Sequence, residues 1–314
     1  AKGLLIVTGP RSPNAGALVR MTADTAVADS GIAAASISGT VVDALFELLP
    51  DMTLAQAQLD LDSGNPHVAG FEIPVTVTLN TQVVRDHRTG HNVLGYLPPT
   101  TGQSVEKPYV MLGAHYDHLG RGEDGSSLAK ADESGDIHNG ADDNASGVAA
   151  ALAIARAVVA SPLAASLLIA LVDAEEAGLL GARQFVRQPP VPLGQIALNV
   201  NLDMVSRTAG LLWAVGAHHT PALRPVIKEA TADAPVIVKQ GHDRPNAPEG
   251  ANWTNSSDHA PFHQAGIPFV YFGVEDHVDY HRSTDDFENV DPVEYLASVR
   301  TILTVLRALD EALR

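Results

Sequence analysis

The stretch Tyr109–Asp117 reads YVMLGAHYD and places His115 and Asp117 directly after a short apolar run. Such a run is typical of a strand that is buried on both faces. Three further apolar runs follow, at Leu167–Val172, Ile196–Leu202 and Pro268–Phe272. Between and after them come patterns with helical spacing, at Ala145–Val159, Ala177–Val186, Pro221–Ala232 and Pro292–Leu313. Strands that alternate with helices predict an α/β fold, with a mixed, largely parallel sheet flanked by helices on both faces.

The ends of these runs carry acids and a histidine. The side chains that follow the first three runs are His115 and Asp117, then Glu175 and Glu176, then Asp203. In a parallel sheet, the ligand site lies outside the carboxyl ends of the strands. An acid such as Asp203, at the end of an apolar strand, is costly to bury unless it is paired or bound to a metal. We therefore expect a functional site at this edge of the sheet.

The first residues of the chain predict a separate small unit. Apolar runs at Gly3–Gly9 and Gly31–Ser38 have the pattern of short strands, and Thr40–Leu49 has apolar residues at helical spacing. We interpret residues 1–70 as a small α/β segment. The following domain is expected to span residues 71–314.

The second domain is expected to open with a hairpin. From Phe71 to Val84 the letters FEIPVTVTLNTQVV alternate between polar and apolar residues, as in a long strand. Asn92–Leu97 is the predicted partner, across a turn at Thr89–Gly90.

The composition excludes several functions. The 314 residues include 37 acids and 20 bases, a net charge of −17 that would repel nucleic acid and anionic lipid. The longest apolar run, Ala164–Val172, is well short of the roughly 20 residues that a membrane helix needs. We therefore expect no nucleic-acid binding and no membrane span. Part of the acidity is expected to belong to metal sites.

The chain contains no cysteine, which excludes disulfide bonds, thiolate ligands and cysteine nucleophiles. Any metal must therefore be held by His, Asp and Glu. The sequence starts with Ala-Lys-Gly, without Met or a signal-like segment, so we expect a processed or truncated product.

Five stretches carry the chemistry: GAHYDHLG at Gly113–Gly120, GADDNASG at Gly140–Gly147, DAEEAGLLG at Asp173–Gly181, NLDM at Asn201–Met204 and DYHRSTDD at Asp279–Asp286. Any one of the acid pairs alone would be typical of a solvated loop or helix start. Together and in this order, the stretches resemble the zinc aminopeptidase family of bacterial secreted leucyl aminopeptidases. More distant relatives in this family are glutamate carboxypeptidase, the transferrin receptor and glutaminyl cyclase. The resemblance runs from about Phe71 to the C-terminus and implies the zinc exopeptidase fold.

The resemblance also implies a set of metal ligands. It makes His115 and Asp203 ligands of one zinc ion, Glu176 and His281 ligands of a second, and Asp143 the bridge between them. Three protein ligands per ion leave open positions for water and substrate, as a catalytic zinc requires. Relatives often have a cis peptide after the bridging residue, so we expect one between Asp143 and Asn144.

Three further residues are expected to take part in the reaction. We assign Glu175 as the general base toward a zinc-bridging water and then as the acid toward the leaving amine. Asp117 is expected to accept the second N–H of the His115 ring. Tyr280 matches the family's phenol that hydrogen-bonds the developing oxyanion. The implied reaction is removal of N-terminal residues from peptides.

Other functions stay open at this point. The same site could serve a carboxypeptidase or dipeptidase if an arginine met the substrate carboxylate, and Arg207, Arg244 and Arg282 are present. A glutaminyl cyclase with one zinc keeps much of the same ligand set. A metal-free binding protein, as in the receptor branch, fits the full ligand set poorly. The sequence leaves the side-chain preference and the oligomeric state open.

Several other residues are expected to lie around the site. His118 is expected to face away along its loop, and the loop from Arg121 to His138 to form a flexible rim. His259 and His263 lack the glutamate of an HExxH motif, so Asp258 and His259 are expected to pack near the site without binding metal.

The resemblance has two further implications. Residues 1–70 resemble the later part of a protease-associated domain, on the letters GLLIVTG and GIAAASIS. This implies a lid or packing role for the segment. The resemblance also implies a secreted or periplasmic location.

Overall fold

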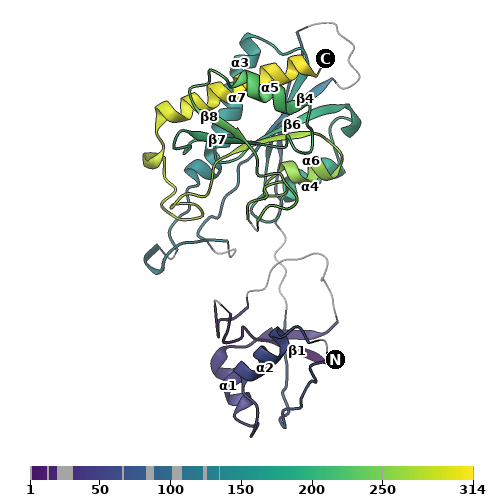
Figure 1. Ribbon diagram of the computed structural model, residues 1–314, viewed down its shortest axis with the longest axis vertical. Helices are drawn as coiled ribbons and strands as arrows, with labels where there is room; N and C mark the ends of the chain where they lie inside the picture. The colour runs from purple at the N-terminus through teal and green to yellow at the C-terminus, as the bar shows by residue number, and fades with distance from the viewer. Residues whose placement is uncertain are drawn as a thin grey trace. The chain divides into compact units, whose positions relative to one another are not determined.

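The computed structural model describes residues 2–12, 14–19, 31–65, 67–82, 88–100, 108–122, 126–133, 135–248 and 250–313. The chain forms two compact units, Ala1–Arg88 and Thr89–Arg314 (Figure 1).

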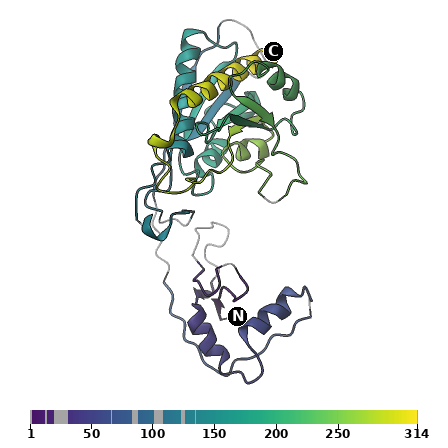
Figure 2. The ribbon, with the colours of Figure 1, turned by 60° about the vertical axis from the view of Figure 1, so that its left-hand side comes forward.

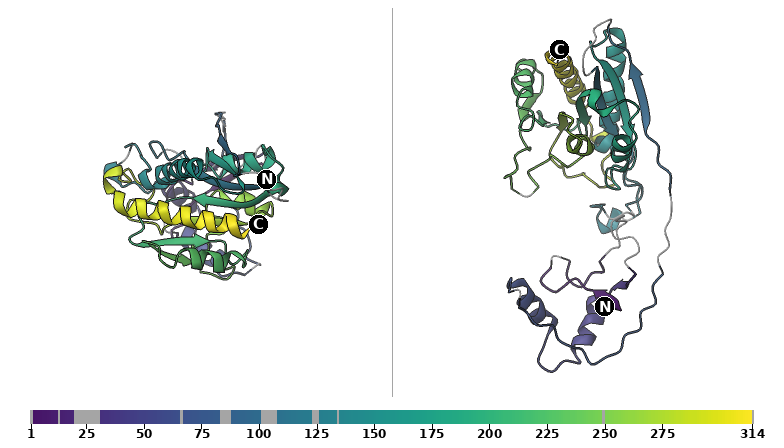
Figure 3. Two further views of the ribbon diagram at one scale, coloured as in Figure 1. Left: turned by 90° about the horizontal axis from the view of Figure 1, so that it is seen from above. Right: turned by 90° about the vertical axis from the view of Figure 1, so that its right-hand side faces the viewer.

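The described residues of the first unit form two strands and two helices (Figure 3, purple to blue). Strand β1 (Gly3–Ile6) pairs in parallel with β2 (Ala33–Ser36), and helices α1 (Gly39–Phe46) and α2 (Leu54–Asp62) follow. The strands and α1 match the expected α/β segment, whereas α2 was missed. The hydroxyl of Thr53 caps α2 by accepting a hydrogen bond from the Gln56 N–H at 3.1 Å.

The segment after α2 differs from the prediction. Residues 71–82 run extended without strand pairing, so the expected strand is wrong there, and residues 83 and 84 lie outside the described residues. Phe71 packs edge-on against Phe46, with 5.6 Å between the ring centroids. The side chain of Leu79 lies so close to Gly3 that a Cβ there would be 2.6 Å from Cδ1. These contacts attach residues 71–82 to the first unit, beyond the expected boundary at residue 70.

The second unit is built on one sheet of seven strands, in the order β3-β5-β4-β6-β9-β7-β8. The neighbours β5, β4, β6 and β9 run parallel, β3 runs antiparallel to β5, and β7 runs antiparallel to β9 but parallel to β8. The strands are β3 (Val93–Leu97), β4 (Tyr109–His115), β5 (Ser166–Val172), β6 (Ile196–Leu202), β7 (Leu211–Val215), β8 (Ile237–Gln240) and β9 (Phe269–Gly273). This is the mixed, largely parallel sheet that the sequence predicts.

Helices cover both faces of the sheet (Figure 1). The helices of this unit are α3 (Gly147–Ala160), α4 (Leu180–Arg187), α5 (Leu223–Ala230), α6 (His259–Gln264) and α7 (Pro292–Ala312), with short 3-10 turns at Ala131–Glu133, Leu193–Gln195 and Phe287–Asn289. Val110, Leu112 and Ala114 of β4 pack with residues of α3, α5 and α7, whereas Met111 packs with residues of α4 and α6. The alternation along β4 thus places one helical layer on each face. In Figure 2, α7 lies beside α3 on the same face.

One stretch among the described residues, Ala141–Ala160, is long and apolar enough to cross a membrane by length and composition, and it joins the π-helical turn Ala141–Ser146 to α3. Half of the most apolar 18-residue part of this stretch is buried within the fold. Its residues Ala150, Ala151 and Ile154 belong to the core that covers the sheet. This burial is the behaviour of a core helix.

Candidate metal centre

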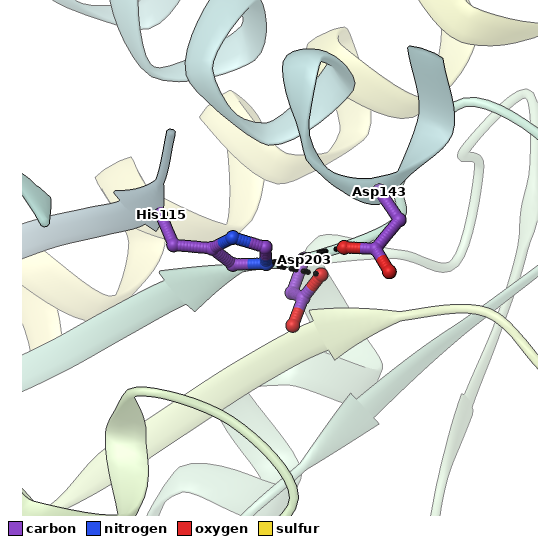
Figure 4. Close-up of side chains that lie close together, drawn as sticks. All are labelled: His115, Asp143 and Asp203. Atoms are coloured by element: carbon purple, nitrogen blue, oxygen red, sulfur yellow. Dashed lines mark hydrogen bonds and ion pairs between the residues drawn. The ribbon is translucent and has the colours of Figure 1, made fainter. Parts of the chain in front are cut away.

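Three side chains from separate elements meet at the carboxyl edge of the sheet (Figure 4). His115 is the last residue of β4, Asp203 follows β6, and Asp143 lies in the turn before α3. The Nε2 atom of His115 lies 3.2 Å from Asp143 Oδ1 and 3.3 Å from Asp203 Oδ1. Two ligand atoms about 2.0–2.1 Å from one tetrahedral zinc would lie about 3.3–3.4 Å apart. These three side chains therefore fit one zinc ion.

The second oxygen of Asp143 faces another cluster. Asp143 Oδ2 lies 3.3 Å from His281 Nε2, which in turn lies 3.5 Å from Glu176 Oε2. These separations again fit two edges of a zinc tetrahedron. The structure thus brings together all five of the ligands that the resemblance implies, with Asp143 between the two clusters.

The charges in the two clusters are strongly coupled. Burial alone would raise the pKa of Asp143, but hydrogen bonds with His115 and His281 lower it. Burial would lower the pKa of His115, but the charge of Asp203 and contacts with Asp117 and Asp143 raise it well above its usual value. Burial is likewise outweighed at His281, where Asp143 and Glu176 raise the pKa to about 9. A bound cation would replace the protons of His115 and His281 and would itself offset the negative charge of these carboxylates.

Both imidazoles are oriented by backbone carbonyls. His115 Nδ1 lies 3.1 Å from the carbonyl oxygen of Asp117, and His281 Nδ1 lies 2.9 Å from that of Ser126. A carbonyl only accepts hydrogen bonds, so we assign the ring proton to Nδ1 in each case. With a cation bound, each Nε2 would lose its proton and direct its lone pair at the ion.

The Asp117 carboxylate does not accept the expected hydrogen bond from the His115 ring. Its nearest oxygen is 3.7 Å from His115 Nδ1, farther than the Asp117 carbonyl. The carboxylate instead accepts hydrogen bonds from the N–H groups of Glu175 at 3.0 Å and Glu176 at 3.2 Å. Asp117 therefore fixes the backbone of the turn that carries both glutamates.

The turn that carries Asp143 is held from two sides. The buried Asp285 carboxylate accepts hydrogen bonds from the N–H groups of Asp142 and Asp143 at 3.0 Å. The side chain of Asn144 donates to the Leu202 carbonyl at 2.9 Å, which ties the turn to the end of β6. The peptide bond between Asp143 and Asn144 is cis, as the resemblance implied.

Comparison with known proteins decides the family. Residues 92–306 match Peptidase family M28. The chain belongs to this peptidase family. It is 28% identical over 212 residues to aminopeptidase YwaD of Bacillus subtilis. The alignment covers 65% of this chain and 41% of YwaD.

Solved structures share the fold of this M28 chain. A zinc aminopeptidase from Bacillus subtilis aligns with a TM-score of 0.53 at 23% identity, over 68% of this chain and 49% of that protein. A Zn-dependent exopeptidase from Parabacteroides distasonis aligns with a TM-score of 0.55 at 20% identity, over 69% and 77%. A glutaminyl cyclase from Bacteroides thetaiotaomicron aligns with a TM-score of 0.55 at 22% identity, over 69% of this chain and 77% of that protein.

The chain spans less than half of the length of the YwaD aminopeptidase and about half of that of the zinc aminopeptidase structure. The M28 match begins at residue 92 and does not cover the first unit. The resemblance of residues 1–70 to a protease-associated domain therefore stays a prediction.

Glu175 lies next to the predicted M28 ligand Glu176 and is partly buried. Burial, together with the charges of Asp203 and Asp258, raises the pKa of its carboxyl to about 10, although the charge of His115 acts in the opposite direction. Cations bound in the clusters would act in the opposite direction and favour the carboxylate. This group can therefore change its protonation state inside the site, as an acid and base must.

Tyr280 stacks on His281, with 3.9 Å between the ring centroids and 25° between the planes. Burial raises the pKa of its phenol, and the negative charge of Asp143 adds to this effect. The hydroxyl group therefore stays protonated and can donate a hydrogen bond at the edge of the second cluster.

Asp258 and His259 lie in the protein interior beside the M28 centre. His259 stacks between Phe269 and Tyr271, each 4.7 Å away between centroids, and its Nε2 lies 2.8 Å from the Trp253 carbonyl. Neither His259 nor His263 belongs to the groups of described residues that could hold a metal ion. The ring of His259 thus packs in the interior of the domain, as expected.

The prediction for His118 is wrong. Its ring points into the site, with Nδ1 2.8 Å from Glu176 Oε1. The three-residue spacing from His115 carried no signal for this direction, because the loop after β4 is irregular. Asp285 was also missed, although the doubled acid in the DYHRSTDD stretch could have marked it.

Proposed function

We propose that this M28 chain is a zinc-dependent aminopeptidase that holds two zinc ions bridged by Asp143. The supporting observation is the position of this one carboxylate, which presents Oδ1 to His115 and Oδ2 to His281. A shared carboxylate offsets the repulsion between two cations held roughly 3.5–4 Å apart.

The donor set of the chain fits zinc. His115 and Asp203 would complete the site of one ion, and Glu176 and His281 would complete the other. Imidazole and carboxylate ligands without any thiolate suit a catalytic zinc, with open positions for substrate. When bound, zinc supplies positive charge that polarises a peptide carbonyl and makes water more acidic.

The remaining steps belong to side chains of this chain. Glu175 takes the proton of the attacking water and returns it to the leaving amine. Tyr280 donates a hydrogen bond to the carbonyl oxygen as negative charge develops on it. Asp117 holds the turn of Glu175 through the two backbone N–H groups that it accepts. Peptides are the substrates that these roles imply.

The charges around the site favour a substrate with a free amino terminus. A carboxypeptidase would need an arginine that is free to meet the substrate carboxylate. Arg207 lies 2.6 Å from Asp279, and Arg282 is paired with Glu133. Arg244 is exposed on the loop after β8. Two of the three candidate arginines are thus neutralised by acids, and the acid-rich site attracts an ammonium group.

Two wider assignments are part of the proposal. A secreted or periplasmic location rests on the resemblance to secreted leucyl aminopeptidases, and fractionation of cells of the source organism tests it. A role of residues 1–70 as a protease-associated-like segment rests on its small α/β unit. Deletion of this segment from the full chain should change the affinity for long peptides more than that for leucine anilide.

Three substrates test the proposed activity. The zinc-loaded protein should hydrolyse leucine p-nitroanilide and leave an N-blocked peptide with a free C-terminus intact. Chelation should abolish the hydrolysis, and zinc should restore it. Cleavage of the blocked peptide alone would identify a carboxypeptidase, and cyclisation of an N-terminal glutamine peptide with one zinc per chain would identify a cyclase. Either result would reject the proposal.

A further inference from the structure

His118 makes a close contact with one of the predicted zinc ligands. Its Nδ1 lies 2.8 Å from Oε1 of Glu176, and both side chains are largely buried, with 8% and 11% of their surfaces exposed. A carboxylate only accepts hydrogen bonds, so Nδ1 carries the proton and donates it to Oε1. This contact links the loop after β4 to the turn after β5.

The two oxygens of Glu176 have different partners. Oε1 faces His118, and Oε2 lies 3.5 Å from Nε2 of His281. One oxygen of the carboxylate is therefore in a hydrogen bond, and the other is directed at the second cluster. Such an arrangement holds a carboxylate in one orientation before a cation binds.

His118, Asp143 and Glu176 also form one of the groups that could hold a metal ion, but the short distance between His118 and Glu176 is that of a hydrogen bond. Two atoms bound to one zinc at about 2.0–2.1 Å would lie about 3.3–3.4 Å apart. The distance of 2.8 Å between Nδ1 and Oε1 is that of a strong N–H···O bond. Nδ1 is also 4.0 Å from Asp143 Oδ2, too far for an edge of the same tetrahedron.

The ring of His118 is fixed by close packing. Gly140, with a φ of +61°, lies so near that a Cβ there would be 2.7 Å from Cγ of the imidazole. The ring of His281 packs edge-on at 5.9 Å between centroids. The neighbouring Asp117 binds the backbone of the same glutamate turn. Asp117 thus holds the backbone of this turn, and His118 holds the Glu176 side chain.

We propose that His118 is a positioning residue that orients Glu176 for the second zinc ion. It keeps Oε1 out of the coordination sphere and directs Oε2 toward the ion. The inference rests on the proposed function, because it assumes that Glu176 binds zinc. Loss of the hydrogen bond should weaken the second site and leave the first site intact.

Three substitutions of His118 separate the hydrogen bond from other roles. The amide nitrogen of Asn occupies the place of Nδ1, whereas that of Gln reaches the place of Nε2. We expect H118L and H118Q to bind the second zinc roughly 10–100-fold more weakly, a range typical for the loss of such a partner. H118N should bind both ions nearly as the unchanged protein does. His219→Leu is the control, because His219 bonds to Thr254 and to none of the predicted ligands.

The measurement is zinc per chain by atomic absorption after dialysis against zinc buffers, with the melting temperature of the chelated protein as a check on folding. If H118L fails to fold, the comparison of H118N with H118Q decides. Wild-type affinity in H118L and H118Q would overturn the proposal. Equal loss in H118N and H118Q would also overturn it, in favour of direct ligation by the imidazole. A wild-type protein without a second zinc would instead reject the proposed function.

Discussion

At the scale of single residues, the site gives two adjacent glutamates different surroundings. Glu176 lies between His118 and His281, within reach of the second cluster. The Glu175 carboxyl is partly buried and is influenced by the charges of His115, Asp203 and Asp258. The difference in surroundings predicts a difference in function, which neutral substitutions can reveal.

Replacement of Glu175 by Gln should separate metal binding from turnover. Glutamine keeps the size of the side chain but cannot accept and return a proton. We expect E175Q to keep two zinc ions per chain and to lose about 10²–10⁴-fold in kcat on leucine p-nitroanilide, the range for general acid–base catalysis. The matched variant E176Q should instead lose the second zinc. An active E175Q protein would show that another group is the base.

Zinc binding should release protons. Contacts with Asp203 and Asp143 raise the pKa of His115, and contacts with Asp143 and Glu176 raise that of His281 to about 9. Both rings therefore carry protons near neutral pH when no cation is bound, and zinc must displace them. The zinc affinity should fall as the pH is lowered below about 9.

Isothermal titration calorimetry in two buffers of different ionisation enthalpy measures this release. We expect at least one proton per chain at pH 7, and fewer at pH 9.5. The same proton count at both pH values would contradict the assignment of His115 and His281 as ligands.

At the scale of elements, the turn Ala141–Ser146 depends on a residue far away in the chain. Asp285, just before α7, is fully buried and accepts the N–H groups of Asp142 and Asp143. Without this carboxylate, two buried donors would lose their partner. Each such loss costs about 1–3 kcal/mol.

Asp285→Ala should therefore lower the free energy of unfolding by roughly 2–6 kcal/mol and weaken zinc binding at both sites. The reason for the second effect is that Asp143 bridges the two clusters. Urea denaturation and zinc titration measure the two effects. The neighbouring Asp286→Ala removes a contact with the exposed Asn139 and should cost less than about 1 kcal/mol. Equal effects of the two variants would contradict the role of Asp285.

The four central parallel strands and the helices α3, α4, α5 and α7 could be predicted because their apolar residues have a clear period, whereas β7, β8 and α6 were missed. The runs at Tyr109, Leu167, Ile196 and Pro268 became β4, β5, β6 and β9. The strand expected at Phe71–Val84 failed in its described part, because alternation of Val and Thr indicates an extended chain without identifying a partner. Val75 and Val77 are in fact 44% and 48% exposed. Strand β3 pairs with β5 instead.

The five predicted ligands could be located through the resemblance of five sequence stretches to a known family, and three of them, His115, Glu176 and Asp203, also follow predicted strands. His118 could not, since the direction of a side chain in an irregular loop follows no sequence period. The role of Asp117 was misassigned for the same reason. Sequence separation alone placed it near His115, whereas its carboxylate turns toward the backbone of Glu175 and Glu176.

At the scale of the whole molecule, the metal centre joins the separate elements of the second unit. Its proposed ligands come from β4, the turn before α3, the loops after β5 and β6, and the loop after β9. Bound zinc would therefore link segments that are distant in the sequence. A ligand that binds only the folded state raises its stability.

Zinc should raise the melting temperature of the chelated protein. At a free zinc concentration 100 times the dissociation constant, one site contributes about 2.7 kcal/mol. For a unit of this size, this corresponds to roughly 5–10 °C. Differential scanning calorimetry with and without chelator measures the shift, and Asp203→Asn should reduce it. A melting temperature that is independent of zinc would contradict a metal centre that spans the unit.

The most direct test of the dinuclear centre is a crystal structure of the zinc-loaded protein with anomalous data collected on both sides of the zinc absorption edge. We predict two anomalous peaks roughly 3.5–4 Å apart, one beside His115 and Asp203, the other beside Glu176 and His281, with one oxygen of Asp143 on each. A single peak, or a pair of peaks that Asp143 does not bridge, would contradict the account.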